Sequence, residues 1–373
     1  MKTVKDINID NKNVIIRFDY NVPIKNGIIV DDTRIIKSLK TLNYCLERAN
    51  KIIILSHLGR IKNVEDKEFN SLKPICDYLS NLINKKISFC NYTNIEETIN
   101  NNKIIMMENT RFFDLDNKKE SNNDESLSKF FASFGDVFIN DAFGTCHRSN
   151  ASNVGISKFL PSCNGFLVEE EINNLNKLVL NSDKPYVVIM GGKKVSDKIQ
   201  VINNLINKVD KILIGGAMVF TFLKAKGKNV GKSFVEENYI NYAKELLDKY
   251  SNKIVLAEDF YNQEKELKEL LDKDDIGYDI GNKSINIFEK ELSNAKTIFF
   301  NGPMGLFEEN YDYGTKELCN FLNDLNSFIV IGGGDTVTAV NKYTKENKFI
   351  ISTGGGASLE YLEGKKLPGI IEG

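Results

Sequence analysis

The chain has 373 residues, with 49 Lys and Arg against 51 Asp and Glu and a formal net charge of −2. That balance excludes a basic nucleic-acid coat protein, and a content of 42% hydrophobic and 27% charged residues excludes a disordered chain. Because single hydrophobic cores stop growing near ~250–300 residues, the length predicts two domains.

No apolar stretch approaches the ~18 residues of a membrane helix, and the N-terminus lacks the hydrophobic core of a signal peptide. We therefore expect a cytoplasmic protein that binds neither membranes nor nucleic acid. The six cysteines show no Cys-x-x-Cys spacing and are expected to be reduced and mostly structural. With only His57 and His147 present, a zinc site built from a histidine cluster is excluded.

In the first half of the chain, apolar runs rich in Ile and Val alternate with segments of helical periodicity. The runs predict strands at 14–22, 52–57, 103–108 and 137–141. The periodic segments predict helices at 33–50, 72–83 and 125–134. The polar, charged stretch 116–125 predicts a solvated loop.

Residues 165–181 predict one helix, ended by Ser-Asp-Lys-Pro at 182–185, which could join two domains as a stiff connector. Beyond it, strands are predicted at 186–190, 211–214, 253–257, 297–300, 328–331 and 349–352. Helices are predicted near 197–208, 218–226, 239–249 and 336–345. Such repetition indicates an α/β fold with parallel sheets covered by helices on both faces, and it places ligand sites at the carboxyl ends of strands.

The predicted strands of the second half end in glycine-rich turns. Glycine lets backbone N–H groups approach an anion at a helix N-terminus without side-chain obstruction. Together the turns predict a phosphate-bearing ligand, with Lys194 and Lys198 adding positive charge and Asp335 offering a carboxylate to a hydrated Mg²⁺. The turns are Gly191-Gly192, Gly215-Gly216, Gly302-Pro303-Met304-Gly305, Gly332-Gly333-Gly334 and Gly354-Gly355-Gly356.

Two motifs that would indicate other nucleotide sites are incomplete. Gly227 and Gly231 enclose three residues where a P-loop requires four, so a surface turn is predicted there. No Gly-x-Gly-x-x-Gly opens a helix after a strand, which disfavours a nicotinamide dehydrogenase.

All six arginines precede residue 150, whereas the chain contains 43 lysines. A planar guanidinium grips phosphate or carboxylate with two donors, which lysine cannot do. Arg34 opens a predicted helix and Arg60, Arg111 and Arg148 follow strands, so on a parallel sheet they converge on one edge. They predict a pocket for a small, multiply anionic molecule, with separate surface ion pairs as the alternative. Arg48, near a helix end, is assigned to the helix dipole.

Motifs spread in order over the whole chain closely resemble those of the phosphoglycerate kinase family. They are Arg17-Phe-Asp-Tyr-Asn-Val-Pro23, Asp32-Thr-Arg34, Ser56-His-Leu-Gly-Arg60, Glu108-Asn-Thr-Arg-Phe112, Asn140-Asp-Ala-Phe-Gly-Thr145 with His147-Arg148, Lys194-Val-Ser-Asp-Lys198, Asn301-Gly-Pro-Met-Gly305, Gly332-Gly-Gly-Asp-Thr336 and Thr353-Gly-Gly-Gly-Ala-Ser-Leu-Glu360.

The resemblance implies two Rossmann-like lobes joined by a hinge helix. A substrate lobe would span 1–164, with the tail 360–373 docking back on it, and a nucleotide lobe would span 165–359, including hinge helix 165–181. The implied activity is a glycolytic phosphotransfer between 1,3-bisphosphoglycerate with ADP and 3-phosphoglycerate with ATP. It would use Mg²⁺, proceed on hinge closure and belong to a cytoplasmic monomer.

The resemblance also implies the site residues. Substrate contacts fall on Asp19, Asn21, Arg34, His57, Leu58, Gly59, Arg60, Arg111 and Arg148. Nucleotide contacts fall on Gly192, Lys194, Lys198, Gly215, Gly216, Asn301, Glu308, Gly333, Gly334, Asp335 and Thr336. Glu308 would take the ribose and Asp335 would lie near the metal. The turn Gly354, Gly355 and Gly356 would offer a helix N-terminus to the moving phosphoryl group.

The expected chemistry needs no general base, because a carboxylate nucleophile is already ionised at neutral pH. The expected catalytic residues are Arg34, bridging the transferring phosphoryl oxygens, with Lys194 opposite it, and Lys198. His57 is expected to donate a hydrogen bond to substrate, in a neutral or charged form. His147 is expected to be structural, since Arg148 beside it supplies the contact.

Two alternatives to this enzyme stay open. One is an anion-binding protein that kept the fold and lost turnover, which the intact set Arg34, Lys194, Lys198 and Asp335 disfavours. The other is a different small-molecule kinase on a related scaffold, distinguishable by its acceptor. A few positions depart from the family pattern without removing a catalytic group, namely Ile61, Lys193, Asn282 and Phe300.

Overall fold

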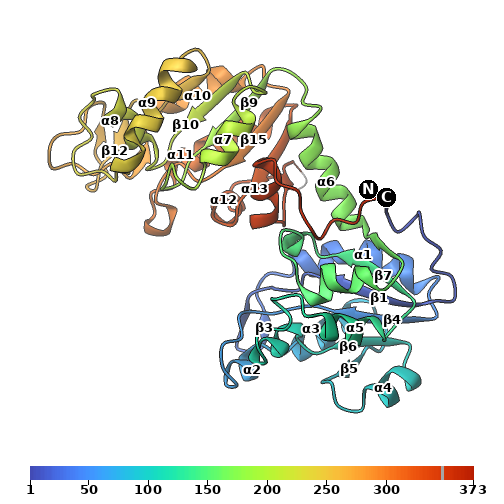
Figure 1. The fold of residues 1–373 in the computed structure, drawn as a ribbon. Coiled ribbons are helices and arrows are strands. Elements are labelled where there is room, and N and C mark those ends of the chain that lie inside the picture. Colours follow the sequence, from blue (N-terminus) through green and yellow to red (C-terminus); the bar gives the residue numbers. More distant parts are fainter. Residues whose placement is uncertain (346–347) are drawn as a thin grey trace. The chain divides into compact units, whose positions relative to one another are not determined.

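The computed structural model describes residues 1–345 and 348–373, which divide into two compact units. Unit 1 comprises Met1–Ile172 and Lys366–Gly373, and unit 2 comprises Asn173–Lys365. Each unit is built on one six-stranded parallel sheet with helices around it (Figure 1). No helix in the described part of the chain is long and apolar enough to cross a membrane.

The sheet of unit 1 has the strand order β5-β6-β4-β1-β7-β8. Its strands are β1 Asn13–Phe18, β4 Lys51–Leu55, β5 Ser88–Cys90, β6 Ile104–Met107, β7 Val137–Asp141 and β8 Ser162–Asn164. Unit 1 also contains a hairpin of β2 Ile24–Lys25 and β3 Ile28–Ile29. The α-helices of unit 1 are α1 Thr33–Leu46, α2 Asp66–Phe69, α3 Lys73–Leu82, α4 Ile95–Asn101 and α5 Glu125–Ala132. Shorter helical turns include η1 Thr110–Leu115, η2 Phe143–Thr145 and η3 Ala151–Gly155.

The core of unit 1 lies on both faces of its sheet, because successive side chains of a strand point to opposite faces. From β1, Val14 and Ile16 pack in the cluster that contains residues of α1 and α3. Ile15 packs in the other cluster, with Leu127 and Phe131 of α5. Apolar residues on both sides of a strand are what a parallel sheet covered by helices requires.

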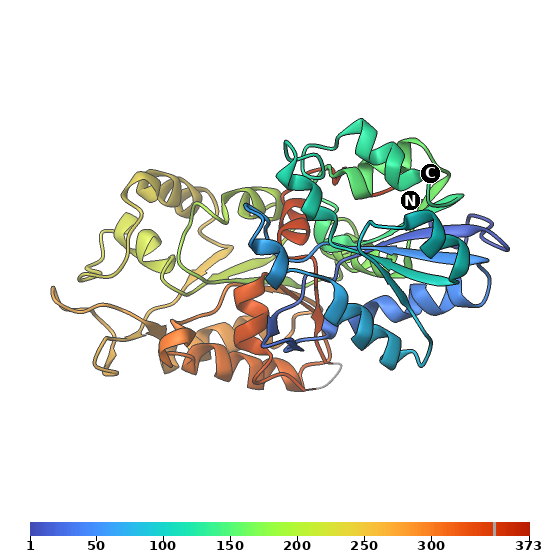
Figure 2. The same ribbon diagram turned by 90° about the horizontal axis from the view of Figure 1, so that it is seen from below.

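The sheet of unit 2 has the strand order β11-β10-β9-β15-β16-β17. Its strands are β9 Tyr186–Met190, β10 Lys211–Ile214, β11 Ile254–Leu256, β15 Thr297–Asn301, β16 Phe328–Gly332 and β17 Ile350–Ile351. A small antiparallel sheet contains β12 Phe260–Tyr261, β13 Leu267–Lys268 and β14 Asp279–Ile280. Its helices are α7 Ile199–Leu205, α8 Val219–Ala225, α9 Ile240–Lys249, α10 Asn282–Leu292, α11 Tyr313–Asp324, α12 Gly334–Val340 and α13 Gly356–Leu362. Figure 2 shows the pair α8 and α9 on one side of this sheet and the pair α10 and α11 on the other.

Helix α6, Phe166–Val179, begins in unit 1 and ends in unit 2. Its start is capped by the buried carboxylate of Asp141, whose Oδ1 accepts from the backbone N–H groups of Leu167 at 2.8 Å and Val168 at 3.2 Å. The C-terminal segment packs within unit 1, where the Asn140 side chain donates to the carbonyl of Gly369 at 2.7 Å. The end of β7 therefore anchors both the connecting helix and the chain terminus.

The predicted α/β fold with two parallel sheets is confirmed, and several element limits were wrong. The strand predicted over 14–22 ends at Phe18, and the helix predicted over 33–50 ends at Leu46. Two amphipathic helices, α10 and α11, lie outside the predicted elements. The predicted turn between Gly227 and Gly231 is confirmed, since no helix or strand occupies it. All six cysteines are free and buried.

Candidate active site

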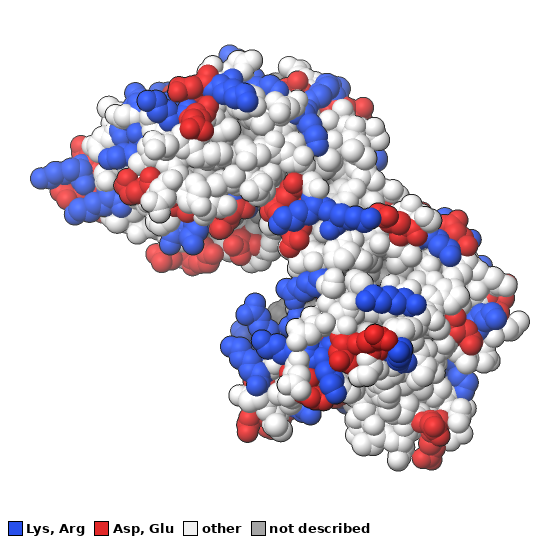
Figure 3. All heavy atoms as spheres, in the orientation of Figure 1, with Lys and Arg blue, Asp and Glu red and all other residues white. Residues whose placement is uncertain are grey.

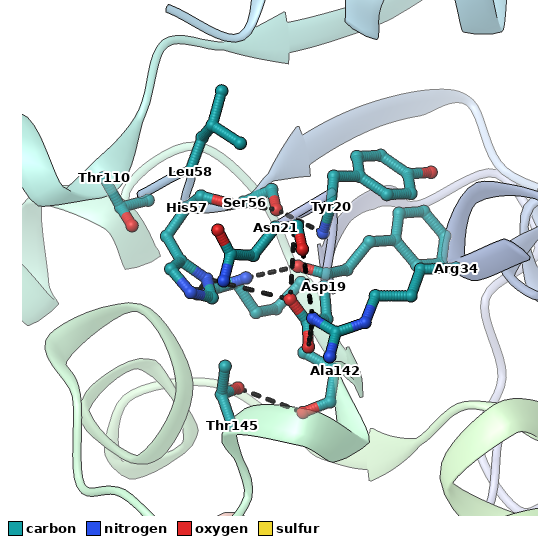
Figure 4. A network of polar contacts seen from close by, with 12 residues as sticks. Asp19, Tyr20, Asn21, Arg34, Ser56, His57, Leu58, Thr110, Ala142 and Thr145 are labelled. Atoms are coloured by element: carbon teal, nitrogen blue, oxygen red, sulfur yellow. Dashed lines mark hydrogen bonds and ion pairs between the residues drawn. The ribbon is translucent and has the colours of Figure 1, made fainter. Parts of the chain in front are cut away.

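The first group of predicted site residues lies at the carboxyl end of β1, where Asp19 faces Arg34 (Figure 4). The Arg34 guanidinium donates through Nη1 to Asp19 Oδ2 at 2.8 Å and to the Asn21 carbonyl at 3.3 Å. The Asn21 side chain in turn accepts from the backbone N–H of Gly59 at 2.9 Å. The loop after β1, the start of α1 and the loop after β4 are thus held together by these predicted substrate residues.

His57 lies two residues after the end of β4 and is 5% exposed, and its ring belongs to the same group (Figure 4). Burial, followed by the positive charges of Arg17, Arg111, Arg34 and Arg148, holds the pKa of His57 well below its usual range. The imidazole is therefore neutral at neutral pH. Of the neutral and charged forms considered from the sequence, the environment of His57 favours the neutral one.

The other predicted arginines come from the loops after β4, β6 and β7. Arg111 donates through Nη1 to the Gly59 carbonyl at 2.9 Å, and burial together with the charge of Arg148 lowers its pKa. Arg60 is exposed, and its positive charge also lowers the pKa of Arg111. Leu58 contributes its carbonyl to Asn109 at 2.7 Å. Figure 3 shows lysine and arginine side chains gathered on the side of unit 1 that carries α2 and β3.

The positive charges of Arg60 and Arg148 repel that of Arg111, which is unfavourable in the absence of an anion. Such repulsion is expected at a site that binds an anion. Arg48 stands apart from the group, as predicted. It donates to the Tyr44 carbonyl at 3.1 Å in the last turn of α1 and lies over the Tyr44 ring.

Glu120 was missed by sequence reasoning, because it lies within the stretch predicted to be a solvated loop. Its side chain is instead 1% exposed and accepts from the Ser152 backbone at 3.0 Å and the Thr110 hydroxyl at 3.1 Å. The positive charge of Arg17, which is also 1% exposed, stabilises the charged form of Glu120. Burying a charge is costly unless an opposite charge lies near it. Only the tertiary structure brings Glu120 and Arg17 together.

The second group of predicted residues surrounds a cavity of about 420 Å³ in unit 2. Four of the predicted nucleotide residues line it, namely Gly192, Gly216, Glu308 and Asp335. Lys193 lines it too, with its ammonium 4.9 Å from the centre of the Phe234 ring, another lining residue. A cavity of this size, with an aromatic wall and a few polar groups, suits a small organic ligand.

Glycine is required where the turns after β9, β10 and β15 meet at this cavity. Gly216 has φ +60°, and a Cβ there would lie 2.5 Å from the backbone nitrogen of Gly192. Gly302 has φ +96°, and its Cβ would lie 2.2 Å from the Gly191 carbonyl. These backbone segments touch with no room for side chains, so the predicted turns form one continuous wall. Gly215 belongs to the same wall, with Met304 beside it.

Asn301 links the lysine turn to the next strand end. Its Oδ1 accepts from Lys198 Nζ, and its amide donates to the Gly332 carbonyl at 2.6 Å. Burial lowers the pKa of Lys198. Thr336 lies behind this wall, where its hydroxyl accepts from the Gly302 N–H at 2.7 Å. Asn301 and Thr336 therefore position the turns, while Gly333 and Gly334 open α12.

Lys194 is exposed in the turn that also carries Ser196. A residue that sequence reasoning missed holds this turn in place. Glu236 accepts from the Ser196 hydroxyl at 2.7 Å and from its backbone N–H at 3.1 Å. No local motif marks Glu236, because its partner lies 40 positions earlier.

The third predicted element of the site is the turn Gly354, Gly355 and Gly356, which opens α13. Gly355 has φ +50°, and a Cβ built there meets no atom within 4 Å. The turn is therefore open on this side.

Of the departures from the family pattern, Phe300 is fully buried in β15 and Ile61 is 8% exposed. Asn282 starts α10 and accepts from the Tyr313 hydroxyl.

In the described part of the chain, no three His, Cys, Asp or Glu side chains gather as a metal-binding group. Asp335 is an exposed single carboxylate on the first turn of α12, and it lines the cavity. One carboxylate facing this cavity fits Mg²⁺, which binds to phosphates and keeps most of its waters.

Comparisons with known proteins agree with this arrangement. The family model described as phosphoglycerate kinase matches residues 4–365. The chain is 48% identical to the phosphoglycerate kinase of Enterococcus faecalis over 388 residues, covering 99% of this chain and 98% of that one. The relative of the same name from Fusobacterium nucleatum is also 48% identical, with 99% and 98% of the two chains covered.

Solved structures give the same result. The phosphoglycerate kinase of Coxiella burnetii superimposes with a TM-score of 0.88 at 34% identity, covering 99% of this chain and 97% of that one. The enzyme of Pyrococcus horikoshii gives a TM-score of 0.82 at 30% identity, again covering 99% and 97%. Agreement of motifs, fold and near-complete coverage leaves one conclusion: this chain belongs to the phosphoglycerate kinase family.

Proposed function

We propose that the chain divides the phosphoglycerate kinase reaction between its two units. As a member of this family it is a glycolytic phosphotransferase, moving a phosphoryl group between 1,3-bisphosphoglycerate with ADP and 3-phosphoglycerate with ATP. The arginine group of unit 1 would bind the phosphoglycerate, and the glycine-walled cavity of unit 2 would bind the nucleotide. The observation that carries this assignment is the convergence of Arg34, Asp19, Arg111 and neutral His57 at one sheet end.

In the proposed mechanism, the residues of unit 1 orient the acceptor carboxylate. That group is ionised at neutral pH, so transfer needs positioning and charge stabilisation and no general base. Arg34 is held by Asp19 and Asn21 and presents its guanidinium to the transferring phosphoryl oxygens. From unit 2, Lys194, Lys198 and the N-terminus of α13 would stabilise charge on the nucleotide side.

Mg²⁺ is part of this proposal. Asp335 would hold it together with the nucleotide phosphates, and when bound it would neutralise charge that develops on them. Glu308, which lines the same cavity, would take the ribose. A cytoplasmic, monomeric enzyme with no nucleic-acid or membrane partner completes the proposal.

The domain assignment is likewise a proposal. A substrate lobe of 1–164 with the tail 360–373 and a nucleotide lobe of 165–359 would place the hinge in α6. Because reacting atoms must come within ~3–3.5 Å of each other, the two lobes would have to close for transfer.

A coupled assay of the purified chain tests the function. We expect ATP consumption with 3-phosphoglycerate that requires Mg²⁺, and none with unphosphorylated glycerate, which cannot engage the arginines with a phosphate. Activity with another small acceptor in place of 3-phosphoglycerate would favour a different kinase. Tight binding of both ligands without turnover would favour the anion-binding alternative.

A further inference from the structure

The buried Arg17 side chain contacts His57 directly, and the proposed mechanism gives it no role. Its Nη2 lies 3.1 Å from His57 Nδ1. Its other donors are also used: Nε donates to the Ser152 hydroxyl at 2.9 Å, and Nη1 donates to the Phe18 carbonyl. Arg17 is 1% exposed and His57 is 5% exposed, so water competes little for this contact.

The contact determines which nitrogen of His57 carries the proton. An arginine side chain has only donors and does not deprotonate in proteins, so the nitrogen that it meets must be an acceptor. A neutral imidazole has one acceptor and one donor, and with Nδ1 accepting, the proton lies on Nε2. The opposite tautomer would direct a second donor at the guanidinium.

Asp19 does not reverse this assignment. Its Oδ1 lies 4.0 Å from His57 Nδ1, beyond hydrogen-bond distance, and its other oxygen accepts from Arg34. The remaining charged groups that act on the ring are Arg34, Arg111 and Arg148, all of which oppose a charged imidazole. In the described part of the chain no group hydrogen-bonds Nε2 of His57, which leaves that nitrogen for a ligand.

Arg17 is itself held in place from the other side. Ser152 accepts from Arg17 Nε, and its own hydroxyl donates to Glu120. Of the negative charges that act on Arg17, that of Glu120 has the largest effect. Because Glu120 is held by Thr110 and by the Ser152 backbone, the guanidinium has little freedom to leave the imidazole.

We propose that Arg17 is a positioning residue that holds His57 as the neutral Nε2–H tautomer, so that a donor and not an acceptor is offered to an anionic oxygen of the substrate. The proposal rests on the proposed function for the identity of that ligand. Glu120 and Ser152 act through Arg17 and do not contact substrate in this scheme. An acceptor at Nε2 would repel the same oxygen, so the tautomer matters for binding.

The tautomer is measurable in the free protein, because the chain has only two histidines. Full-length protein labelled with ¹⁵N-histidine would be studied by long-range ¹H–¹⁵N correlation, with His147→Gln used only to assign the two rings. For His57 we expect Nδ1 at the position of an unprotonated nitrogen and Nε2 at that of a protonated one, unchanged from pH 6 to 8. A protonated Nδ1, or a charged ring, overturns the proposal.

The role of Arg17 is tested by Arg17→Met combined with Glu120→Gln, which avoids leaving a buried carboxylate without its counter-charge. Backbone amide spectra would establish that the fold is kept. We expect the His57 nitrogens to shift toward each other, as in a mixture of tautomers. If both resonances keep their wild-type positions in the folded variant, Arg17 does not select the tautomer.

A kinetic comparison does not depend on that variant folding. The amide nitrogen of glutamine can take the place of Nε2, whereas that of asparagine can take only the place of Nδ1. We expect KM for 3-phosphoglycerate to be at least about tenfold lower in His57→Gln than in His57→Asn at similar kcat, the value of one charge-assisted hydrogen bond. Equal KM values would overturn the proposal. Wild-type turnover tests the proposed function separately, so the two can fail independently.

Discussion

At the scale of single residues, the proposed transfer depends on donors whose geometry lysine cannot reproduce. Arg34 Nη1 donates both to Asp19 and to the Asn21 carbonyl, which holds the guanidinium at the carboxyl end of β1. The Arg34 side chain is 30% exposed, whereas that of Asp19 is 7% exposed.

Arg34→Lys should therefore lower kcat by ~10³-fold or more, because one ammonium cannot hold Asp19 and bridge phosphoryl oxygens together. The coupled assay measures this, with circular dichroism to establish that the fold is kept. Arg48→Lys is the matched control, since Arg48 lies at the end of α1 away from the site and should leave kcat unchanged. Near-normal turnover in Arg34→Lys would remove Arg34 from the mechanism.

Lys193 bears a charge that the family pattern lacks at this position, and it lies against the aromatic wall of the cavity proposed to bind the nucleotide. A charge near a polyphosphate contributes more as ionic strength falls. ADP affinity should thus depend more steeply on salt in the wild type than in Lys193→Ala. Calorimetric titrations at low and high salt measure this, with Lys244→Ala on α9 as control. Parallel salt curves for all three proteins would show that Lys193 contributes nothing.

At the scale of elements, the start of α6 depends on one buried acid. Asp141 Oδ1 accepts from two N–H groups of the helix, while Oδ2 has no hydrogen-bond partner among the described residues. Burial raises the pKa of Asp141 to about 6. The folded state therefore binds this proton more tightly than the unfolded state, where the pKa is ~3.9.

A raised carboxyl pKa contributes stability that is present below pH ~4 and is lost as the pH rises through about 6. Asp141→Asn removes this loss. We expect the free energy of unfolding of the variant, relative to wild type, to rise by ~2–3 kcal/mol between pH 4 and pH 7. Urea unfolding of both proteins at the two pH values measures the difference. A constant difference across this range would mean that Asp141 titrates normally.

The element scale also explains where prediction from sequence was inaccurate. Beyond Phe18 the apolar residues Tyr20 and Val22 recur at every second position, so the sequence pattern predicted a longer strand. The chain leaves the sheet after Phe18 because the Tyr20 N–H donates to the Ser56 hydroxyl and Asp19 turns to Arg34. The residues of the proposed substrate loop therefore lie outside the sheet.

At the scale of the whole molecule, the proposed substrate and nucleotide sites lie in different units and α6 belongs to both. Because transfer requires contact between the two ligands, binding both should make the particle more compact than binding either alone. Small-angle scattering with 3-phosphoglycerate and an unreactive ATP analogue measures the radius of gyration. Samples with each ligand alone are the controls. An unchanged radius with both sites occupied would contradict closure.

Much of the fold and part of the candidate site can be predicted from local patterns in the sequence. Alternating strand and helix periods determine two covered parallel sheets, and the glycine-rich strand ends mark the wall of the unit 2 cavity. The motif arginines can be named as well, because their position after strands determines which sheet edge they reach. These features are predictable since each depends on residues close together in the chain.

Only the tertiary structure decided how the supporting side chains pair. Arg17 meets Ser152 at a separation of 135 positions, and Ser196 meets Glu236 at a separation of 40. Lys193 packs on Phe234, and Glu120 is buried in a stretch whose polarity predicts a solvated loop. Periodicity carries no information about such contacts, because they depend on which segments the packed sheets bring together. The tautomer of His57 belongs to the same class, since a neighbour distant in sequence determines where its proton lies.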